Sequence, residues 1–208
     1  MNEARGGKQK LAQALTRVVA REGIAGISVR SVAAEAGVTG GAVQYHFPTR
    51  AEMIRYAMEW TSMQVEQRLA DVPRWGELHE WTREILLGLL PLDTERHREH
   101  AVWLAFVAHA RTDSALATLK RETNAKLHAL YSRIIRARRG LPVPADDPMA
   151  STLDPDVEAD AVLLQSLLDG LSLHLADLEV HEAARVGPEL LDRYLTLAVD
   201  PPAADEHG

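Results

Sequence analysis

Residues 28 to 53 constrain the fold of this 208-residue chain most, because three helix starts alternate there with two helix stops. Ser28 is placed to cap a helix over about 29–36, and Gly37 ends it with a residue that adopts positive φ at low cost. Thr39 is placed to cap a second helix over about 40–47, which Pro48 stops. Two short helices joined by a tight turn are typical of a helix-turn-helix unit.

The rest of the chain has helical periodicity and no alternating strand pattern. A capping box at Thr49 and Glu52 begins a helix reaching about Leu69. Further helices are expected before Gly23, up to Leu90, after Asp93, from Asp113 to about Arg139, over 157–178 after Asp154-Pro155, and over about 188–199 with Pro188 in the first turn. Segment 140–156 is expected to be a loop and 200–208 a tail. The sequence therefore predicts an all-α fold of about nine helices.

Composition places this fold in a restricted set of protein classes. The hydrophobic content of 46% is ample for a core, and the absence of cysteine excludes disulfides and zinc–thiolate sites and suits a reducing cytoplasm. The N-terminus lacks the long apolar core of a signal peptide, and no uncharged apolar segment is long enough to span a membrane. The net charge of −7 is uneven, since residues 1–50 hold seven basic and three acidic residues, a local net charge of +4. Residues 1–50 thus form a basic segment, the head, and the remaining chain forms an acidic body. This division confines favourable contact with phosphate to the head.

The start of a helix in the major groove offers free backbone amides to DNA, and the second short helix suits this role. Gly40 and Gly41 permit close approach of the backbone, and Gln44 has the two-ended amide that pairs with an adenine edge. Tyr45 and His46 carry polar tips that suit phosphate contact or partial packing on the next helix. The full set of candidate DNA-binding residues is Lys8, Ser28, Arg30, Thr39, Gly40, Gly41, Gln44, Tyr45, His46 and Arg50.

Residues 8–56 resemble the N-terminal domain of the TetR family of transcriptional regulators. The similarity rests on Ser28, Val32-Ala33-Ala34-Glu35-Ala36-Gly37-Val38, Thr39, Tyr45-His46-Phe47, and Thr49-Arg50 with Met53. The family often has a polar side chain where this chain has Gly40 and an aromatic one where it has Gln44, so the operator sequence is expected to differ. Residues 86–106 more weakly resemble the C-terminal domain of the family's BetI-type branch.

The resemblance implies a DNA-binding domain over 1–50 and a helical ligand-binding and dimerisation domain over 51–208. It also implies a homodimeric repressor that binds a palindromic operator on the bacterial nucleoid in the cytoplasm and is released by a small-molecule effector. No cofactor and no membrane partner are expected.

Helix 157–178 carries an uninterrupted apolar seam with heptad spacing. With the last helix it predicts a dimer interface, unless the seam is buried within one chain. The candidate interface residues are Ala161, Leu164, Leu168, Leu171, Leu175, Leu178, Leu191 and Tyr194. A second apolar set, Leu163, Leu167, Gly170 and His174, lies on another face, so this helix must be buried on more than one side.

Large aromatic and polar-tipped side chains in the body predict a tunnel for a flat apolar or cationic effector, although each also suits ordinary core packing. The candidate residues are Trp60, Met63, Trp81, Trp103, Phe106, His109, Tyr131, Gln165 and Asp169. His97 and His100 lack the i, i+4 spacing of a helical zinc pair, so no metal site is expected. No catalytic constellation is present, so no enzyme is expected. The alternative function is a helical small-molecule-binding protein whose N-terminal helices are structural, and the basic head argues against it.

Overall fold

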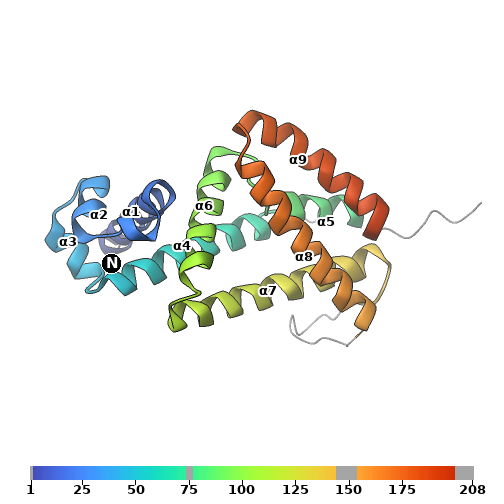
Figure 1. Cartoon of the computed structure of the whole chain (residues 1–208), viewed down its shortest axis with the longest axis horizontal. Helices are drawn as coiled ribbons and strands as arrows, with labels where there is room; N and C mark the ends of the chain where they lie inside the picture. Colours follow the sequence, from blue (N-terminus) through green and yellow to red (C-terminus); the bar gives the residue numbers. More distant parts are fainter. Residues whose placement is uncertain (1, 74–76, 144–153, 200–208) are drawn as a thin grey trace, which may run out of the picture. The chain divides into compact units, whose positions relative to one another are not determined.

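The computed structural model describes residues 2–73, 77–143 and 154–199, and it confirms the all-α prediction (Figure 1). Its α-helices are α1 (Asn2–Glu22), α2 (Val29–Ala36), α3 (Gly40–His46), α4 (Arg50–Ala70), α5 (Leu78–Leu87), α6 (Thr94–His109), α7 (Ser114–Arg138), α8 (Pro155–Ala176) and α9 (Val180–Tyr194). A 3-10 turn, η1 (Ile24–Gly26), precedes α2, and a π turn, η2 (Leu195–Val199), follows α9. Within the described ranges, no helix combines the length and hydropathy needed to cross a membrane.

The predicted caps explain where several helices begin. The Thr49 amide donates to Glu52 Oε2 at 3.0 Å, and the Glu52 amide donates to Thr49 Oγ1 at 3.2 Å, which is the predicted capping box. Asp113 Oδ1 accepts from the amides of Ala115 and Leu116 at the start of α7. Asp154 caps α8, whose first residue is Pro155.

The chain divides into two compact units. The first runs to Arg68 and resumes from Thr94 to Arg121, and the second takes Leu69–Asp93 and the chain from Glu122 onward. In the first unit, α1 packs against both α2 and α6. Its core includes Leu15 of α1, Val43 of α3 and Phe106 of α6, all almost fully buried.

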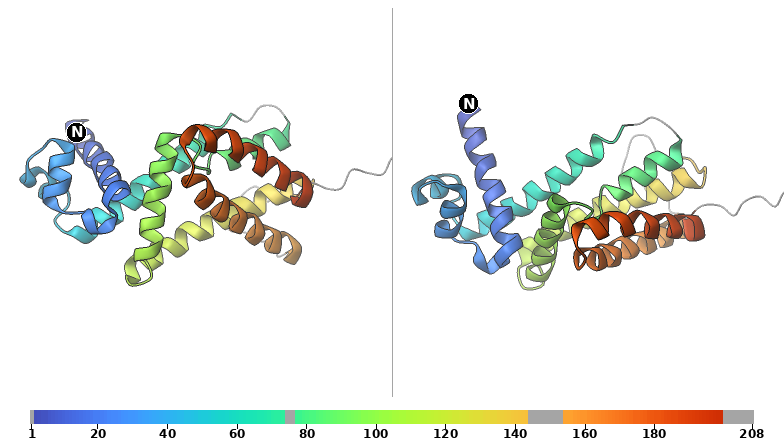
Figure 2. Two further views of the ribbon diagram at one scale, coloured as in Figure 1. Left: turned by 45° about the horizontal axis from the view of Figure 1, so that its top comes forward. Right: turned by 90° about the horizontal axis from the view of Figure 1, so that it is seen from above.

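The core of the second unit is built mainly from α5, α7, α8 and α9. Leu164 and Leu175 of α8 and Leu191 of α9 are completely buried there. Figures 1 and 2 show α8 and α9 side by side from each viewpoint, and the two helices are in contact. A bidentate ion pair between Arg83 and Asp192, 2.5 and 2.8 Å long, joins α5 to α9.

The prediction that the last helix begins at Pro188 was wrong. Helix α9 begins at Val180, so Pro188 lies inside it. Ala183, Gly187 and Leu191 form a buried stripe along this helix, and burial of that stripe offsets the hydrogen bond that proline removes. Helix α8 correspondingly ends at Ala176, and Leu178 lies in the turn between the two helices. Most of the predicted loop, residues 144–153, and the predicted tail, 200–208, lie outside the described residues.

Candidate nucleic-acid interface

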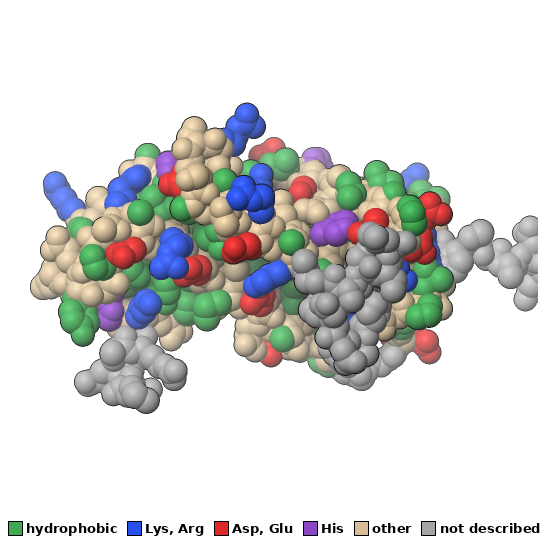
Figure 3. Space-filling view, turned by 90° about the horizontal axis from the view of Figure 1, so that it is seen from below, with side chains coloured by type: hydrophobic (Ala, Val, Ile, Leu, Met, Phe, Trp, Pro, Cys, Tyr) green, Lys and Arg blue, Asp and Glu red, His purple; other side chains and the backbone are tan. Residues whose placement is uncertain are grey.

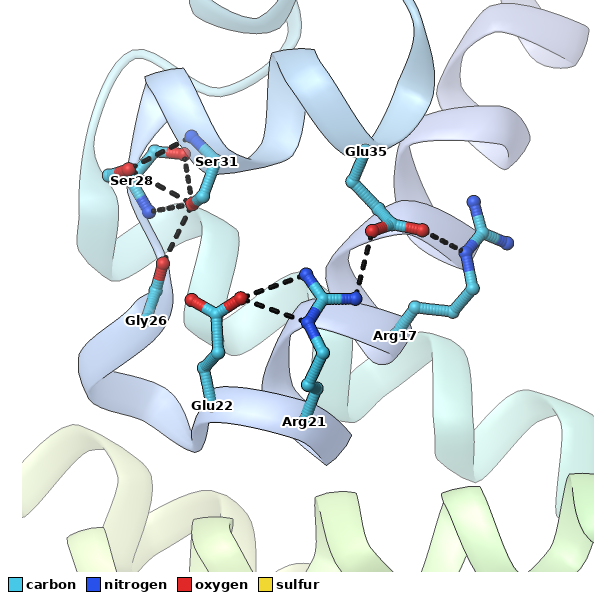
Figure 4. Close-up of polar contacts among 7 residues, drawn as sticks. All are labelled: Arg17, Arg21, Glu22, Gly26, Ser28, Ser31 and Glu35. Carbon is cyan, nitrogen blue, oxygen red and sulfur yellow. Dashed lines mark hydrogen bonds and ion pairs between the residues drawn. The ribbon is translucent and has the colours of Figure 1, made fainter.

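The helix-turn-helix geometry predicted for residues 28–47 is present, and each short helix begins at its expected cap. Ser28 Oγ accepts from the Ser31 amide at 3.0 Å, and Ser31 Oγ accepts from the Ser28 amide at 3.0 Å (Figure 4). Gly37 ends α2 with φ 61°, in the left-handed region where glycine carries no side-chain penalty. Thr39 Oγ1 accepts from the Ala42 amide at 3.3 Å and so begins α3.

Helix α3 has a buried side and an exposed side. Val43 and the following Phe47 are buried in the first core. Thr39, Gly41, Gln44 and Tyr45 are exposed, and Tyr45 is 81% exposed. This side of α3 is therefore accessible to a partner.

The two glycines and His46 differ in what surrounds them. A Cβ at Gly40 would lie 3.3 Å from Val29 Cγ1, so a larger side chain there would press on α2. A Cβ at Gly41 would meet Thr39 Oγ1 at 4.0 Å, an ordinary contact distance. His46 is half-buried, and the centroids of its ring and the Tyr45 ring are 5.1 Å apart. A Cβ placed on Gly7 of α1 would lie 3.6 Å from His46 Nε2. The imidazole therefore lies against the N-terminal part of α1.

Two basic residues of α1 are neutralised within the head. Glu35 of α2 accepts from Arg17 Nε at 2.6 Å and from Arg21 Nη1 at 3.0 Å (Figure 4). Arg21 also forms two hydrogen bonds with Glu22 Oε1. These bonds from Arg17 and then Arg21 lower the pKa of the Glu35 carboxyl, and the bonds to Glu22 and Glu35 raise the pKa of Arg21.

The other candidate basic residues have different surroundings. Lys8 Nζ lies 4.3 Å from the centroid of the Tyr56 ring, a cation–π contact with α4. Arg50 donates to the backbone carbonyls of Ile24 and Ile27. Arg30 is exposed and, among the described residues, has no hydrogen-bond or ion-pair partner. On the face shown in Figure 3, basic and acidic side chains are interspersed and do not form patches of a single sign.

Sequence reasoning missed the role of Glu35. Arg17 and Arg21 are four residues apart and so share one face of α1. Two like charges on one face are the sequence signal that could have prompted a search for an acidic partner. The partner lies on another helix, and only the packing of α1 on α2 brings it within reach.

The seam residues proposed for a dimer interface are covered by their own chain. Ala161, Leu164, Leu168, Leu171, Leu175 and Leu191 are at most 8% exposed and belong to the second core. Leu178 and Tyr194 are half-buried against the same core. The surface that α8 leaves uncovered is its other face, where Val162 is 54% and Leu163 is 59% exposed.

The candidate pocket residues are divided between the two units. In the first unit, Trp103 stacks on buried Phe106 with 5.9 Å between ring centroids, Trp60 and His109 are half-buried, and Met63 is exposed. In the second unit, Trp81 and Gln165 are half-buried and Asp169 is exposed. Burial and, secondarily, the charge of Asp169 raise the pKa of the buried Tyr131 phenol. Phe106 is buried in the core of the first unit and Tyr131 in the core of the second.

Comparison with known proteins matches both parts of the chain. Residues 11–57 match the family described as bacterial regulatory proteins, tetR family, and residues 78–199 match the C-terminal domain of BetI-type transcriptional repressors. The transcriptional regulator PksA of Bacillus subtilis is 32% identical over 170 residues, which cover 80% of this chain and 77% of PksA.

Solved structures show the same relationship. A transcriptional regulator from a Rhodococcus species superposes with a TM-score of 0.67 at 31% identity, covering 89% of this chain and 95% of the other. The multidrug-binding protein EbrR in complex with malachite green gives a TM-score of 0.58 at 25% identity. The superposition covers 89% of this chain and 95% of EbrR. The helix-turn-helix head and the family matches that together span most of the chain lead to one conclusion: the protein belongs to the TetR family of DNA-binding transcriptional regulators and has a BetI-type C-terminal domain.

Proposed function

We propose that this protein is a homodimeric repressor that binds a palindromic operator and leaves it when a small-molecule effector binds. The observation that carries the proposal is the exposed side of α3, with Gln44 and Tyr45 free to meet DNA, in a chain whose C-terminal part matches BetI-type repressors. We assign operator reading to residues 1–50, and effector binding and dimerisation to residues 51–208. Two copies related by a two-fold axis would present two α3 helices to two half-sites.

A gel-shift titration with a random duplex library, followed by recovery of the bound sequences, tests operator binding. Repeated rounds are expected to enrich an inverted repeat, and affinity is expected to fall steeply as salt increases. The absence of salt-sensitive binding to any duplex would refute the repressor function. That outcome would favour the alternative of a ligand-binding protein with structural N-terminal helices.

The proposed dimer interface is the outer face of α8, not the buried seam. Val162, Leu163 and Leu173 are exposed there, and the space around Gly170 is open, which lets a second helix approach closely. Leu190 of α9 and Leu197 of η2 are also exposed. An apolar face of this extent on a soluble protein is typical of an interaction site, and a second copy of the chain is the partner that palindromic recognition requires.

Leu163→Glu tests this interface, because it puts a charge in the centre of the proposed contact without disturbing the core. Light scattering during gel filtration is expected to show a dimer for the wild type and a monomer for the variant. Leu78→Glu is the matched control, since Leu78 is an exposed leucine, 46% accessible, on a different helix, α5. A Leu163→Glu variant that stays dimeric at the wild-type concentration would disprove the proposed face.

For the effector, we propose a flat apolar or cationic molecule. Support comes from the Trp103–Phe106 stack and from EbrR, a relative whose structure was solved with malachite green, a flat aromatic cation. Malachite green is therefore a suitable first probe. It is expected to raise the melting temperature by mass action and to release operator DNA in the same concentration range. If flat cations neither stabilise the protein nor release DNA, the proposed effector class is wrong.

A further inference from the structure

Arg50, the first residue of α4, is bound to the backbone that leads into the helix-turn-helix. Its Nε donates to the Ile27 carbonyl at 3.0 Å, and its Nη2 donates to the Ile24 carbonyl at 2.6 Å. Ile24 is the first residue of η1, and Ile27 is the residue that caps its end, just before Ser28. One side chain thus joins the beginning of α4 to the corner where α2 begins.

The two acceptors match a guanidinium better than an ammonium. Nε and Nη2 lie on one edge of the planar group, so both bonds form with a single side-chain orientation. The cation also lies at the C-terminal end of a short helical turn, where carbonyl oxygens concentrate partial negative charge. A lysine at this position would keep the charge but would have a single donor centre for two carbonyls.

The same corner is held from its other side. Ser31 Oγ donates to the Gly26 carbonyl at 2.7 Å (Figure 4). A Cβ at Gly26 would lie 2.4 Å from Glu22 Cβ, so glycine is needed for α1 to approach this closely. The corner is therefore a fixed point from which α2, and through the Gly37 turn α3, take their direction.

We propose that Arg50 is a positioning residue that sets the orientation of α2 and α3 on α4, and that it is not a phosphate contact. The Nε–Nη2 edge of the guanidinium, which is the edge suited to two-point binding of a phosphate, is occupied by the two carbonyls. This inference rests on the DNA-binding function and replaces the direct role that the sequence suggested for Arg50. Arg30, which has no partner among the described residues, is the contrasting case of a guanidinium available to DNA.

Arg50→Lys and Arg50→Gln distinguish the two roles when binding is measured over a salt series with the selected operator and with a random duplex. Both variants are expected to lose about tenfold or more in operator affinity, the scale of losing a hydrogen bond from a charged group, while the dependence on salt stays that of the wild type. Arg55→Lys is the matched control, because Arg55 lies on the same helix, is exposed and pairs with Glu59. The control is expected to bind as the wild type does.

Two results would overturn the proposal. In one, Arg50→Lys binds as the wild type does and only Arg50→Gln is weakened, with a salt slope smaller by about 1.8 because the dimer loses two contacts. In the other, both variants bind as the wild type does. Failure of the wild type itself to select any operator would instead refute the DNA-binding function, so the two failures are distinguishable.

A measurement on the unmodified protein avoids dependence on the stability of the variants. In arginine-edited NMR spectra, the Nε–H of Arg50 is expected to be visible and slow to exchange in the free protein, and unshifted when the operator is added. The Nε–H of Arg30 is expected to sharpen or shift on DNA binding. An Arg50 signal that is protected only in the presence of DNA would assign it to phosphate and disprove the positioning role.

Discussion

The unequal surroundings of the basic residues in the head lead to a quantitative prediction for DNA binding. Arg30 and Arg17 are both arginines of the first three helices, but Arg30 is exposed without a partner among the described residues, whereas Arg17 is bound to Glu35 at 2.6 Å. Replacing each by glutamine removes the same formal charge. Only the Arg30 substitution is expected to remove a phosphate contact, because Arg17 is already neutralised by Glu35.

The expected size of the effect follows from counterion release. Each lost phosphate contact lowers the slope of log affinity against log salt by about 0.9, so a dimer of Arg30→Gln loses about 1.8. Between about 50 and about 200 mM salt, the variant would therefore lose about tenfold less affinity than the wild type. Arg17→Gln is expected to keep the wild-type slope.

Fluorescence anisotropy with a labelled operator, repeated at four or more salt concentrations, measures these slopes directly. A random duplex of equal length serves as a second ligand, since a phosphate contact affects both duplexes alike. Equal slopes for Arg30→Gln and the wild type, or a slope reduced to the same extent by Arg17→Gln, would refute the assignment of free and neutralised charge in the head.

Three further predictions concern stability. Thr39→Ala should cost about 1 kcal/mol in urea unfolding through loss of the α3 cap, and Thr39→Ser should restore it; equal stability of all three proteins would contradict the cap. Leu175→Ala should lower the free energy of unfolding by about 2–5 kcal/mol and leave the oligomeric state unchanged, because Leu175 is completely buried in its own chain. Dissociation of the dimer without loss of stability would instead show that the seam lies in the dimer interface. Burial and then the charge of His97 lower the pKa of His100 below 6.5, so the unfolded chain binds the proton more readily, and stability should fall as the pH drops below 6.5. His100→Gln should reduce that fall in urea unfolding measured above and below this pH, and an unchanged pH dependence would count against it.

Much of the local structure was predictable because it depends on neighbouring residues. The caps at Ser28, Thr39, Asp113 and Asp154 each bond to an amide two or three residues further along, so the short sequence pattern contains the whole interaction. The same holds for the left-handed turn at Gly37. These elements define the helix-turn-helix, which is why the family could be inferred from about fifty residues.

Features that depend on tertiary packing were not predictable in this way. The heptad seam of α8 showed that two apolar faces exist, but burial by its own chain and burial by a partner produce the same periodicity. Pro188 has the local signature of a helix start, and the buried stripe of Ala183, Gly187 and Leu191 outweighs it. Arg50 was predicted to contact DNA, and the carbonyls that it binds belong to a different element, at η1 and the residue after it.

The packing of α1 against α6 limits how this regulator can be modified by fusion. The residues proposed to contact DNA end near residue 50, but the hydrophobic core of the same unit includes Val102 and Phe106 of α6 and Leu116 of α7. A head excised at residue 50 would therefore carry an unpaired apolar surface and is expected to aggregate. A chimaera that transplants these residues onto another body would need a matching α6, so exchange of operator specificity is better attempted by surface substitutions on α3 than by swapping contiguous segments.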